Sequence, residues 1–210
     1  MQEAQKQIRV MTVDDHPALR EGIAAIVELQ NDMVMVGEAS NGAEAVAAFN
    51  NLRPDVTLMD LQMPGMGGIE AMAAIRKESR NARIIVLTTY DGDAQAAQAI
   101  KAGASGYLLK NTLRKQLLDT IRAVHAGQRY IPPEIAQEIA FHAADDPLST
   151  REIDILKLVA DGNANKAIAW QLSVAEDTVK AHLKSIFTKL DVNDRTRAVT
   201  TALRRGIITL

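Results

Sequence analysis

The first 126 residues alternate short apolar runs with longer amphipathic segments. Five runs have the length and composition of buried strands: Ile8–Val13, Met33–Ala39, Asp55–Met59, Arg83–Thr88 and Ser105–Leu109. Five segments that follow them have helical periodicity: Leu19–Gln30, Ala43–Leu52, Ile69–Lys77, Ala94–Ala102 and Leu113–Ala126. Because parallel strands need crossover helices, this alternation predicts an α/β doubly wound, five-stranded parallel sheet.

The alternation stops at Gly127. Two consecutive prolines and a short helical stretch over residues 134–142 indicate a linker spanning 127–146. Beyond it the pattern is purely helical and predicts a small all-α domain of four helices over residues 147–210. The predicted organisation is therefore a first domain over residues 1–126, the linker, and a helical second domain.

Capping signals place the helices of the second domain. Ser149 and Glu152 form a capping-box pattern, and Gly162 is a typical helix end. A second capping-box pattern, Ser173-x-x-Glu176, predicts the start of the third helix. The first expected helix begins at Ser149, and the second covers Lys166–Leu172. The third begins after Ser173 and runs to about Leu190, and the fourth covers about Arg195–Arg205.

Composition excludes several classes of protein. The chain has 210 residues, of which 47% are hydrophobic. This is enough apolar surface for two packed cores and excludes a chain that is disordered throughout. It has no cysteine, which excludes disulfides, thiolate zinc sites and cysteine nucleophiles. Residues 1–7 are polar and no apolar run reaches the length of about 18 residues typical of a membrane span. We therefore expect a cytoplasmic protein with no membrane partner.

The net charge of −2 is distributed unevenly between the two parts of the chain. Residues 1–147 carry 14 basic and 19 acidic side chains, a net of −5, whereas residues 148–210 carry 10 and 7, a net of +3. The two parts are therefore expected to have different partners, although the excess in the tail is too small to indicate nucleic acid by itself.

Acidic residues follow two of the predicted strands. Asp14 and Asp15 come directly after the first strand and Asp60 after the third, and these strands are expected to be neighbours. Clustered carboxylates repel one another unless a cation lies between them, and hard oxygen ligands suit Mg²⁺. Separately, each residue is typical of a helix cap or a turn. Together they predict a Mg²⁺ site at the carboxyl edge of the sheet.

Two further polar residues close the fourth and fifth strands. Thr88 and Lys110 would face the carboxylates and could receive the oxygens of a phosphoryl group. A carboxylate at the position of Asp60 can attack phosphorus and hold it as an acyl phosphate. Five polar positions at carboxyl strand ends favour this chemistry over five unrelated surface roles.

The first domain resembles the receiver domain of bacterial two-component response regulators, a flavodoxin-like fold. The resemblance covers about residues 8–126 and rests on four stretches: Val13–Pro17, Leu58–Met66, Val86–Thr89 and Ala102–Lys110. It implies that Asp60 is the phosphoacceptor and that a sensor histidine kinase is the donor. It also implies that Asp14, Asp15 and the backbone carbonyl of Gln62 help to bind Mg²⁺, and that Lys110 binds the phosphate. Thr88 and Tyr107 would be the switch pair, with Tyr107 turning inward on phosphorylation.

The third helix of the second domain has two distinct faces. A buried stripe is predicted from Val179, Leu183, Ile186, Phe187 and Leu190. The opposite side carries Lys180, Ala181, Lys184 and Thr188. A small residue between two lysines lets a helix approach DNA closely, although this helix by itself is more typical of an ordinary charged surface.

This region resembles the LuxR-type helix-turn-helix over about residues 146–210. The stretches that match are Leu148–Glu152, Asn165–Ala169, Thr178–Leu183 and Lys189–Thr196. The resemblance implies a recognition helix at about Glu176–Lys189 in the major groove of double-stranded promoter DNA. Lys180, Ala181 and Lys184 would read the groove, and Lys166, Thr178 and His182 would contact the backbone. Ala175 stands where the family often has an N-capping serine.

The last helix carries a narrow strip of small and apolar residues. Ala198, Val199, Ala202 and Leu203 either complete the core of this domain or form a two-fold contact. The family favours the second role, with Val199 and Leu203 as contacts of a homodimer on DNA. Both resemblances together identify the NarL/FixJ class, transcription regulators controlled by phosphorylation of Asp60 and not turnover enzymes.

Two other functions stay open from the sequence. A metal-dependent hydrolase with an aspartate nucleophile would need a further acid–base carboxylate and a substrate cap, neither of which is recognisable. A DNA-binding protein whose receiver serves only as a dimer scaffold would not need the complete set of polar positions.

Overall fold

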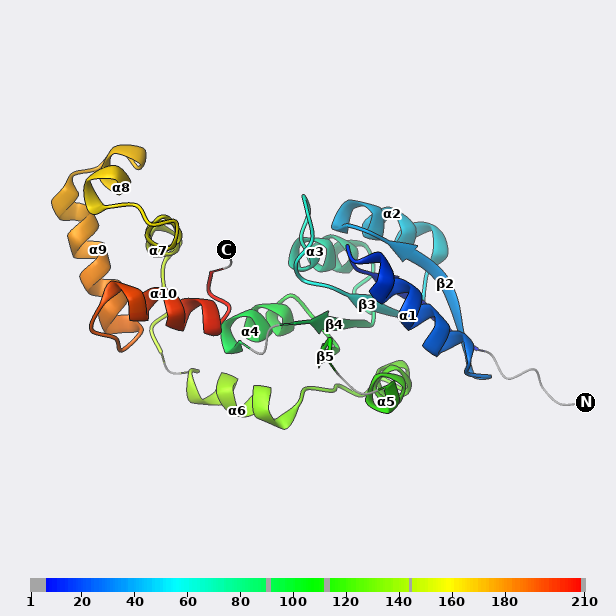
Figure 1. Cartoon of the computed structure of the whole chain (residues 1–210). Helices are drawn as coiled ribbons and strands as arrows, with labels where there is room; N and C mark the ends of the chain where they lie inside the picture. Colours follow the sequence, from blue (N-terminus) through cyan, green and yellow to red (C-terminus); the bar gives the residue numbers. More distant parts are fainter. Residues whose placement is uncertain (1–6, 90–91, 112–113, 144, 209–210) are drawn as a thin grey trace, which may run out of the picture. The chain divides into compact units, whose positions relative to one another are not determined.

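The computed structural model describes residues 7–89, 92–111, 114–143 and 145–208. They divide into two compact units: Met1–Thr89 with Ala97–Pro133, and Tyr90–Ala96 with Glu134–Leu210. The elements, labelled in Figure 1, are β1 (Ile8–Val13), α1 (Pro17–Glu28), β2 (Met33–Ala39), α2 (Gly42–Leu52), β3 (Val56–Met59), α3 (Gly68–Glu78), β4 (Ile84–Thr88), α4 (Asp93–Lys101), β5 (Gly106–Leu109), α5 (Arg114–His125), α6 (Pro133–Phe141), α7 (Thr150–Ala160), α8 (Asn165–Gln171), α9 (Glu176–Lys189) and α10 (Arg195–Arg204). Within the described residues, none of the helices is long and apolar enough to cross a membrane.

The first unit is a five-stranded sheet in the order β2-β1-β3-β4-β5, and all its pairings are parallel. Helices α1 and α5 bury Ile23, Val27, Ile121 and Val124 in one apolar cluster with the strands. Figure 1 shows α2 and α3 on the side of the sheet opposite α5. The predicted doubly wound sheet is therefore confirmed, with β1 and β3 adjacent at its centre.

Most boundaries agree with the sequence pattern. β1 and β2 coincide with the predicted strands, and the other three begin one residue later than expected. α1 begins at Pro17, two residues before the predicted start, because proline suits the first helical position and its missing N–H is not needed there. The expected start of the fifth helix, Leu113, lies outside the described residues.

The second unit contains the four expected helices, α7 to α10, preceded by α6. Their buried apolar side chains form one cluster that includes Ile155, Ile168, Val179, Ile186 and Ala198. The predicted stripe of α9 is confirmed: Val179, Leu183, Ile186 and Leu190 are buried and Phe187 is half-buried against them. Burial of this stripe orients the opposite face of α9 towards solvent.

Glu152 ties the start of α7 to α9. Its carboxylate accepts a hydrogen bond from the Ser149 backbone N–H at 2.8 Å, which completes the predicted capping box. It also accepts from the Ser185 hydroxyl at 2.6 Å and pairs with the Lys189 ammonium at 3.0 Å. Burial alone would raise the pKa of the Glu152 carboxyl, but these hydrogen bonds outweigh burial and lower the pKa to about 2.

The second predicted capping box is wrong. The N-cap of α9 is Ala175, which makes no side-chain cap, and not Ser173. Ser173 has a φ of 53° and its backbone N–H donates to the carbonyl of Trp170. The tight turn between α8 and α9 needs a left-handed residue at this point, so Ser173 lies too early in the turn to cap the helix.

Gly68 begins α3 where that helix meets the end of β3. A Cβ atom added to Gly68 would overlap the backbone carbonyl of Asp60, whereas one added to Gly67 would lie 3.4 Å from the nearest atom, the carbonyl oxygen of Leu61. The Gly68 N–H donates to that same carbonyl at 3.1 Å. The absence of a side chain at position 68 therefore allows α3 to close on the carboxyl end of β3.

Replacing Glu152 with glutamine should lower the free energy of unfolding of the second unit by about 2 kcal/mol at neutral pH, because the folded state binds the charged carboxylate. A carboxyl whose folded pKa is depressed contributes stability above its unfolded pKa, 4.5, and loses it as the pH falls towards 2. The difference between variant and wild type should therefore shrink at about pH 3. Urea unfolding followed by circular dichroism at both pH values measures it, with Glu134→Gln, an exposed glutamate of α6, as the control. A difference independent of pH would contradict this account.

Replacing Gly68 with alanine should destabilise the first unit by about 1–3 kcal/mol, the usual cost of overpacking. Gly67→Ala is the matched control, because its added methyl group has room and only a modest capping preference is lost. Hydrogen–deuterium exchange of peptides covering residues 56–78 would locate the effect. Equal protection of these peptides from exchange in the two variants would show that α3 can move away from β3 without lowering the stability of the unit.

Candidate functional site

The carboxyl ends of β1 and β3 bring two aspartates together. Met59 lies opposite Val13 in the sheet, and the Asp60 N–H donates to the Val13 carbonyl at 2.8 Å. Asp14 and Asp60 are 1% and 2% exposed. Two residues that are 46 positions apart in the sequence therefore share one buried corner because their strands are parallel neighbours.

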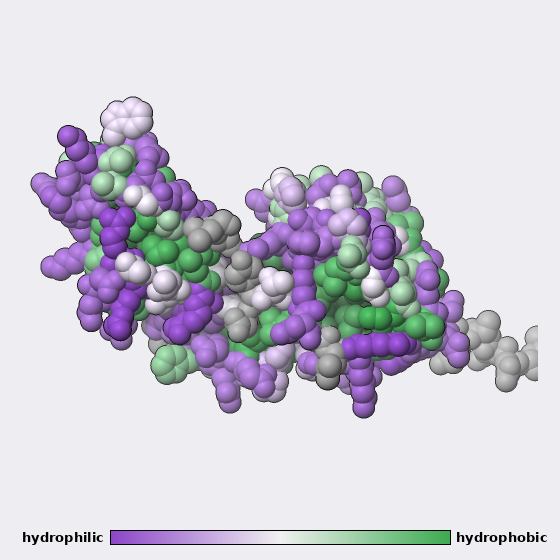
Figure 2. All heavy atoms as spheres, viewed as in Figure 1, coloured by the Kyte–Doolittle hydropathy of each residue, from purple (hydrophilic) through white to green (hydrophobic). Residues whose placement is uncertain are grey.

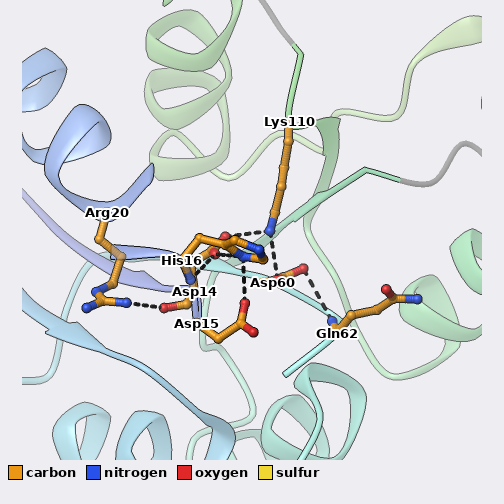
Figure 3. Close-up of polar contacts among 7 residues, drawn as sticks. All are labelled: Asp14, Asp15, His16, Arg20, Asp60, Gln62 and Lys110. Atoms are coloured by element: carbon orange, nitrogen blue, oxygen red, sulfur yellow. Dashed lines mark hydrogen bonds and ion pairs between the residues drawn. The ribbon is translucent and has the colours of Figure 1, made fainter. Parts of the chain in front are cut away.

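Lys110 reaches the same corner from the end of β5. The Lys110 N–H donates to the Thr88 carbonyl at 2.7 Å, continuing the pairing of β4 with β5. Its ammonium lies 2.8 Å from Asp14 Oδ2 and 2.8 Å from Asp60 Oδ2 (Figure 3). One cation thus bridges the two buried carboxylates.

Burial and charge act against each other at this bridge. Burial raises the pKa of the Asp60 carboxyl, although the hydrogen bond from Lys110 opposes the effect. Burial alone would lower the pKa of Lys110, but hydrogen bonds to Asp14 and Asp60 outweigh burial and raise the pKa. The ammonium of Lys110 therefore stays charged while it holds the two carboxylates together.

Asp15 and His16 complete an acidic cluster. Ligand atoms of Asp14, Asp15, His16 and Asp60 all lie within 4.8 Å of one another. The His16 Nδ1 atom is 2.7 Å from Asp15 Oδ1 and 3.2 Å from Asp14 Oδ1, and the His16 side chain is 71% exposed.

The donor set fits a hard divalent cation. The cluster holds three carboxylates, and the Lys110 ammonium pairs with only two of them, which leaves negative charge to be neutralised. Carboxylate oxygens are the ligands that Mg²⁺ prefers. The Gln62 backbone N–H donates to Asp60 Oδ1 at 3.3 Å, while its side chain points away from the carboxylates (Figure 3). The backbone of Gln62 therefore lies beside the cluster, and the role of its carbonyl as a metal ligand stays a prediction.

Thr88 and Tyr107 are both fully buried. Tyr107 lies opposite Val86 in the β4–β5 pair, two residues before Thr88 on β4. The Tyr107 ring therefore lies in the interior of the sheet. Its turn on phosphorylation stays a prediction.

Arg20 and His16 belong to the site, but the sequence reasoning missed both. The Arg20 guanidinium donates to the Asp14 backbone carbonyl at 2.6 Å and pairs with Glu38 at 3.2 Å. It therefore anchors the turn that presents Asp14. No local sequence signal indicated this contact, because Arg20 lies in the first turn of the helix with the predicted start at Leu19 as well as with the observed start at Pro17.

The second unit presents the predicted DNA-binding residues on α8 and α9. Lys166, Thr178, Lys180, Ala181 and Lys184 are exposed and His182 is half-buried. Hydrophilic residues dominate the outer edge of α9 in Figure 2. On α8, Trp170 has an exposed fraction of 83%.

The strip on α10 divides between two environments. Ala198 and Ala202 are fully buried in the core of the unit. Val199 and Leu203 are half-buried and pack against that core from its edge. Only the second pair therefore retains surface that a partner could cover.

Comparison with known proteins assigns each of the two units to a protein family. The chain matches the family "Response regulator receiver domain" over residues 10–122 and the family "Bacterial regulatory proteins, luxR family" over residues 146–202. It is 42% identical to the transcriptional regulatory protein YdfI of Bacillus subtilis and 41% identical to LiaR of the same organism, covering 96% of this chain in both cases and 98% and 99% of those proteins. The structure of the response regulator RcsB in complex with DNA matches with a TM-score of 0.69 at 25% identity, over 95% of this chain and 99% of that chain.

These matches cover both units, and the acidic cluster lies in the part assigned to the receiver. The family consists of transcription factors and not of turnover enzymes. The chain therefore belongs to the two-component response regulators of the NarL/FixJ class, in which a receiver domain is joined to a LuxR-type DNA-binding domain.

Proposed function

We propose that phosphorylation of Asp60 by a sensor histidine kinase controls the binding of this regulator to promoter DNA in the cytoplasm. The receiver would extend over residues 1–126, the linker over 127–146 and the DNA-binding domain over 147–210. The observation that carries the proposal is the bridge from Lys110 to Asp14 and Asp60, with both distances at 2.8 Å. It provides a nucleophile, a cation and an acidic ligand set in one corner.

The chemistry follows from the carboxylate of Asp60. One of its oxygens attacks the phosphorus of the kinase phosphohistidine, and the phosphorus–nitrogen bond breaks with its electron pair going to the imidazole. Asp14, Asp15, Asp60 and the Gln62 carbonyl would hold Mg²⁺, which when bound neutralises charge on the phosphoryl oxygens. Lys110 would exchange its contact with Asp60 for a phosphoryl oxygen, and the Thr88 hydroxyl would donate to another.

Transmission would proceed through β4 and β5. The Lys110 N–H is bonded to the Thr88 carbonyl, so movement of either residue displaces the edge of the sheet. With Tyr107 already inside, phosphorylation would stabilise its buried position. A bias of a few kcal/mol is enough to shift such a two-state equilibrium substantially.

DNA binding would use the exposed faces of α8 and α9. We assign Lys180, Ala181 and Lys184 to base edges and Lys166, Thr178 and His182 to the backbone. Val199 and Leu203 would provide a two-fold contact between copies, consistent with the RcsB dimers seen on DNA. A symmetric dimer reads two inverted half-sites.

Asp60→Asn should abolish phosphoryl uptake, because the amide cannot act as the nucleophile. The full-length chain is incubated with acetyl phosphate and Mg²⁺, and the added phosphoryl group is detected by intact mass. Asp119→Asn, a surface aspartate of α5, is the control and should be phosphorylated as the wild type is. Chelation of Mg²⁺ should prevent uptake by the wild type. Unchanged uptake by Asp60→Asn would exclude this residue as the acceptor.

Lys166→Ala should weaken binding to all duplex sequences alike and reduce the slope of log K against log salt by about 1, because one phosphate contact is lost. Fluorescence anisotropy of the phosphorylated full-length chain with labelled duplex, over a series of salt concentrations, measures both. Lys157→Ala removes an equal charge from the exposed surface of α7 and serves as the control. An unchanged slope would remove Lys166 from the backbone contacts.

A further inference from the structure

The first turn of α9 carries an acid that the DNA-binding assignment does not use. Asp177 is paired with Lys180, with Asp177 Oδ1 3.0 Å from Lys180 Nζ, and Glu176 lies 3.5 Å from the same ammonium. The side chain of Asp177 is 92% exposed. Acidic residues stabilise the first turn of a helix, and Glu176 shares that turn with Asp177.

Asp177 lies on the exposed face of α9, in its first turn. Ala181 and Lys184 follow it at intervals of four and three residues, so these side chains share one side of the helix. The buried residues Val179 and Ile186 lie on the opposite side. If this face enters the major groove, Asp177 enters with it.

A carboxylate in the major groove needs a hydrogen-bond donor. Its oxygens only accept, and the surrounding phosphates repel it. Guanine and thymine present acceptors at this edge, and adenine presents an acceptor beside its amino group. Cytosine presents only its N4 amino group, so it suits a carboxylate without opposing lone pairs.

We propose that Asp177 determines sequence specificity by accepting a hydrogen bond from the N4 amino group of a cytosine in each half-site. The proposal rests on the DNA-binding function assigned above to the exposed face of α9. The ion pair gives Asp177 a second role. By holding Lys180 before DNA binds, it limits the attraction of this lysine to phosphates of any sequence, so that Lys180 is released where cytosine can replace it.

The pair also favours the charged form of the Lys180 side chain. Asp177 and, to a smaller extent, Glu176 raise the pKa of the Lys180 ammonium. A charged lysine is the donor that a guanine O6 or N7 atom requires. Adjacent recognition of cytosine by Asp177 and guanine by Lys180 is therefore chemically consistent.

The test is selection of bound sequences from a duplex library with a randomised segment. The phosphorylated full-length chain is compared with Asp177→Ala and Asp177→Asn. The wild type should enrich cytosine at one position of each half-site by about tenfold or more, and Asp177→Ala should lose that preference while others persist. Asp177→Asn should move the preference towards adenine, whose N6 and N7 suit an amide.

Asp154→Ala is the matched control, because it removes an exposed aspartate from α7. It should leave the selected sequences unchanged. Binding to a fixed non-specific duplex provides a second measurement, in which Asp177→Ala should bind a few-fold more tightly than the wild type.

The outcomes separate the two proposals. If the wild type enriches sequences and Asp177→Ala enriches the same ones, Asp177 does not determine specificity and the inference is overturned, while the proposed function stands. A uniform change in affinity without a change in preference overturns it equally. If the wild type enriches no sequence, the DNA-binding assignment of α9 fails first and the inference fails with it.

Discussion

The bridge of Lys110 to Asp14 and Asp60 is the interaction on which the receiver depends. Two carboxylates with exposed fractions of 1% and 2% lie at one corner, and buried charges are costly unless they are paired. The lysine ammonium pairs with both of them, at 2.8 Å from each. The parallel pairing of β1 with β3 and of β4 with β5 brings the three residues to that corner. The charge balance of the site therefore depends on the strand order of the sheet.

In the second unit, the Glu152 carboxylate likewise connects separate elements of the fold through charged and hydrogen-bonded contacts. It caps α7 and at the same time contacts Ser185 and Lys189 on α9. The position of α9 is thereby connected to a buried charge. Lys189, although basic, is engaged within the domain.

The fold could be predicted from the sequence because hydrophobic periodicity and strand alternation are strong local signals. The positions of Asp14, Asp60 and Lys110 followed from the rule that parallel strands end at one edge. The contact of Arg20 with the Asp14 carbonyl and the cap of α9 could not be predicted, because they depend on the path of the turn before α1 and on a left-handed Ser173, both decided by tertiary geometry. The burial of Tyr107 agrees with its place in the predicted buried strand Ser105–Leu109.

The exposure of Trp170 has a practical consequence. It is the only tryptophan in the chain, and its side chain is 83% exposed on α8, four residues after Lys166 on the same helix. An indole in this environment emits as a solvated fluorophore, and every change in its quenching originates at a single site beside the predicted DNA surface. The protein thus carries an intrinsic optical reporter for the domain that contacts the promoter, without any label.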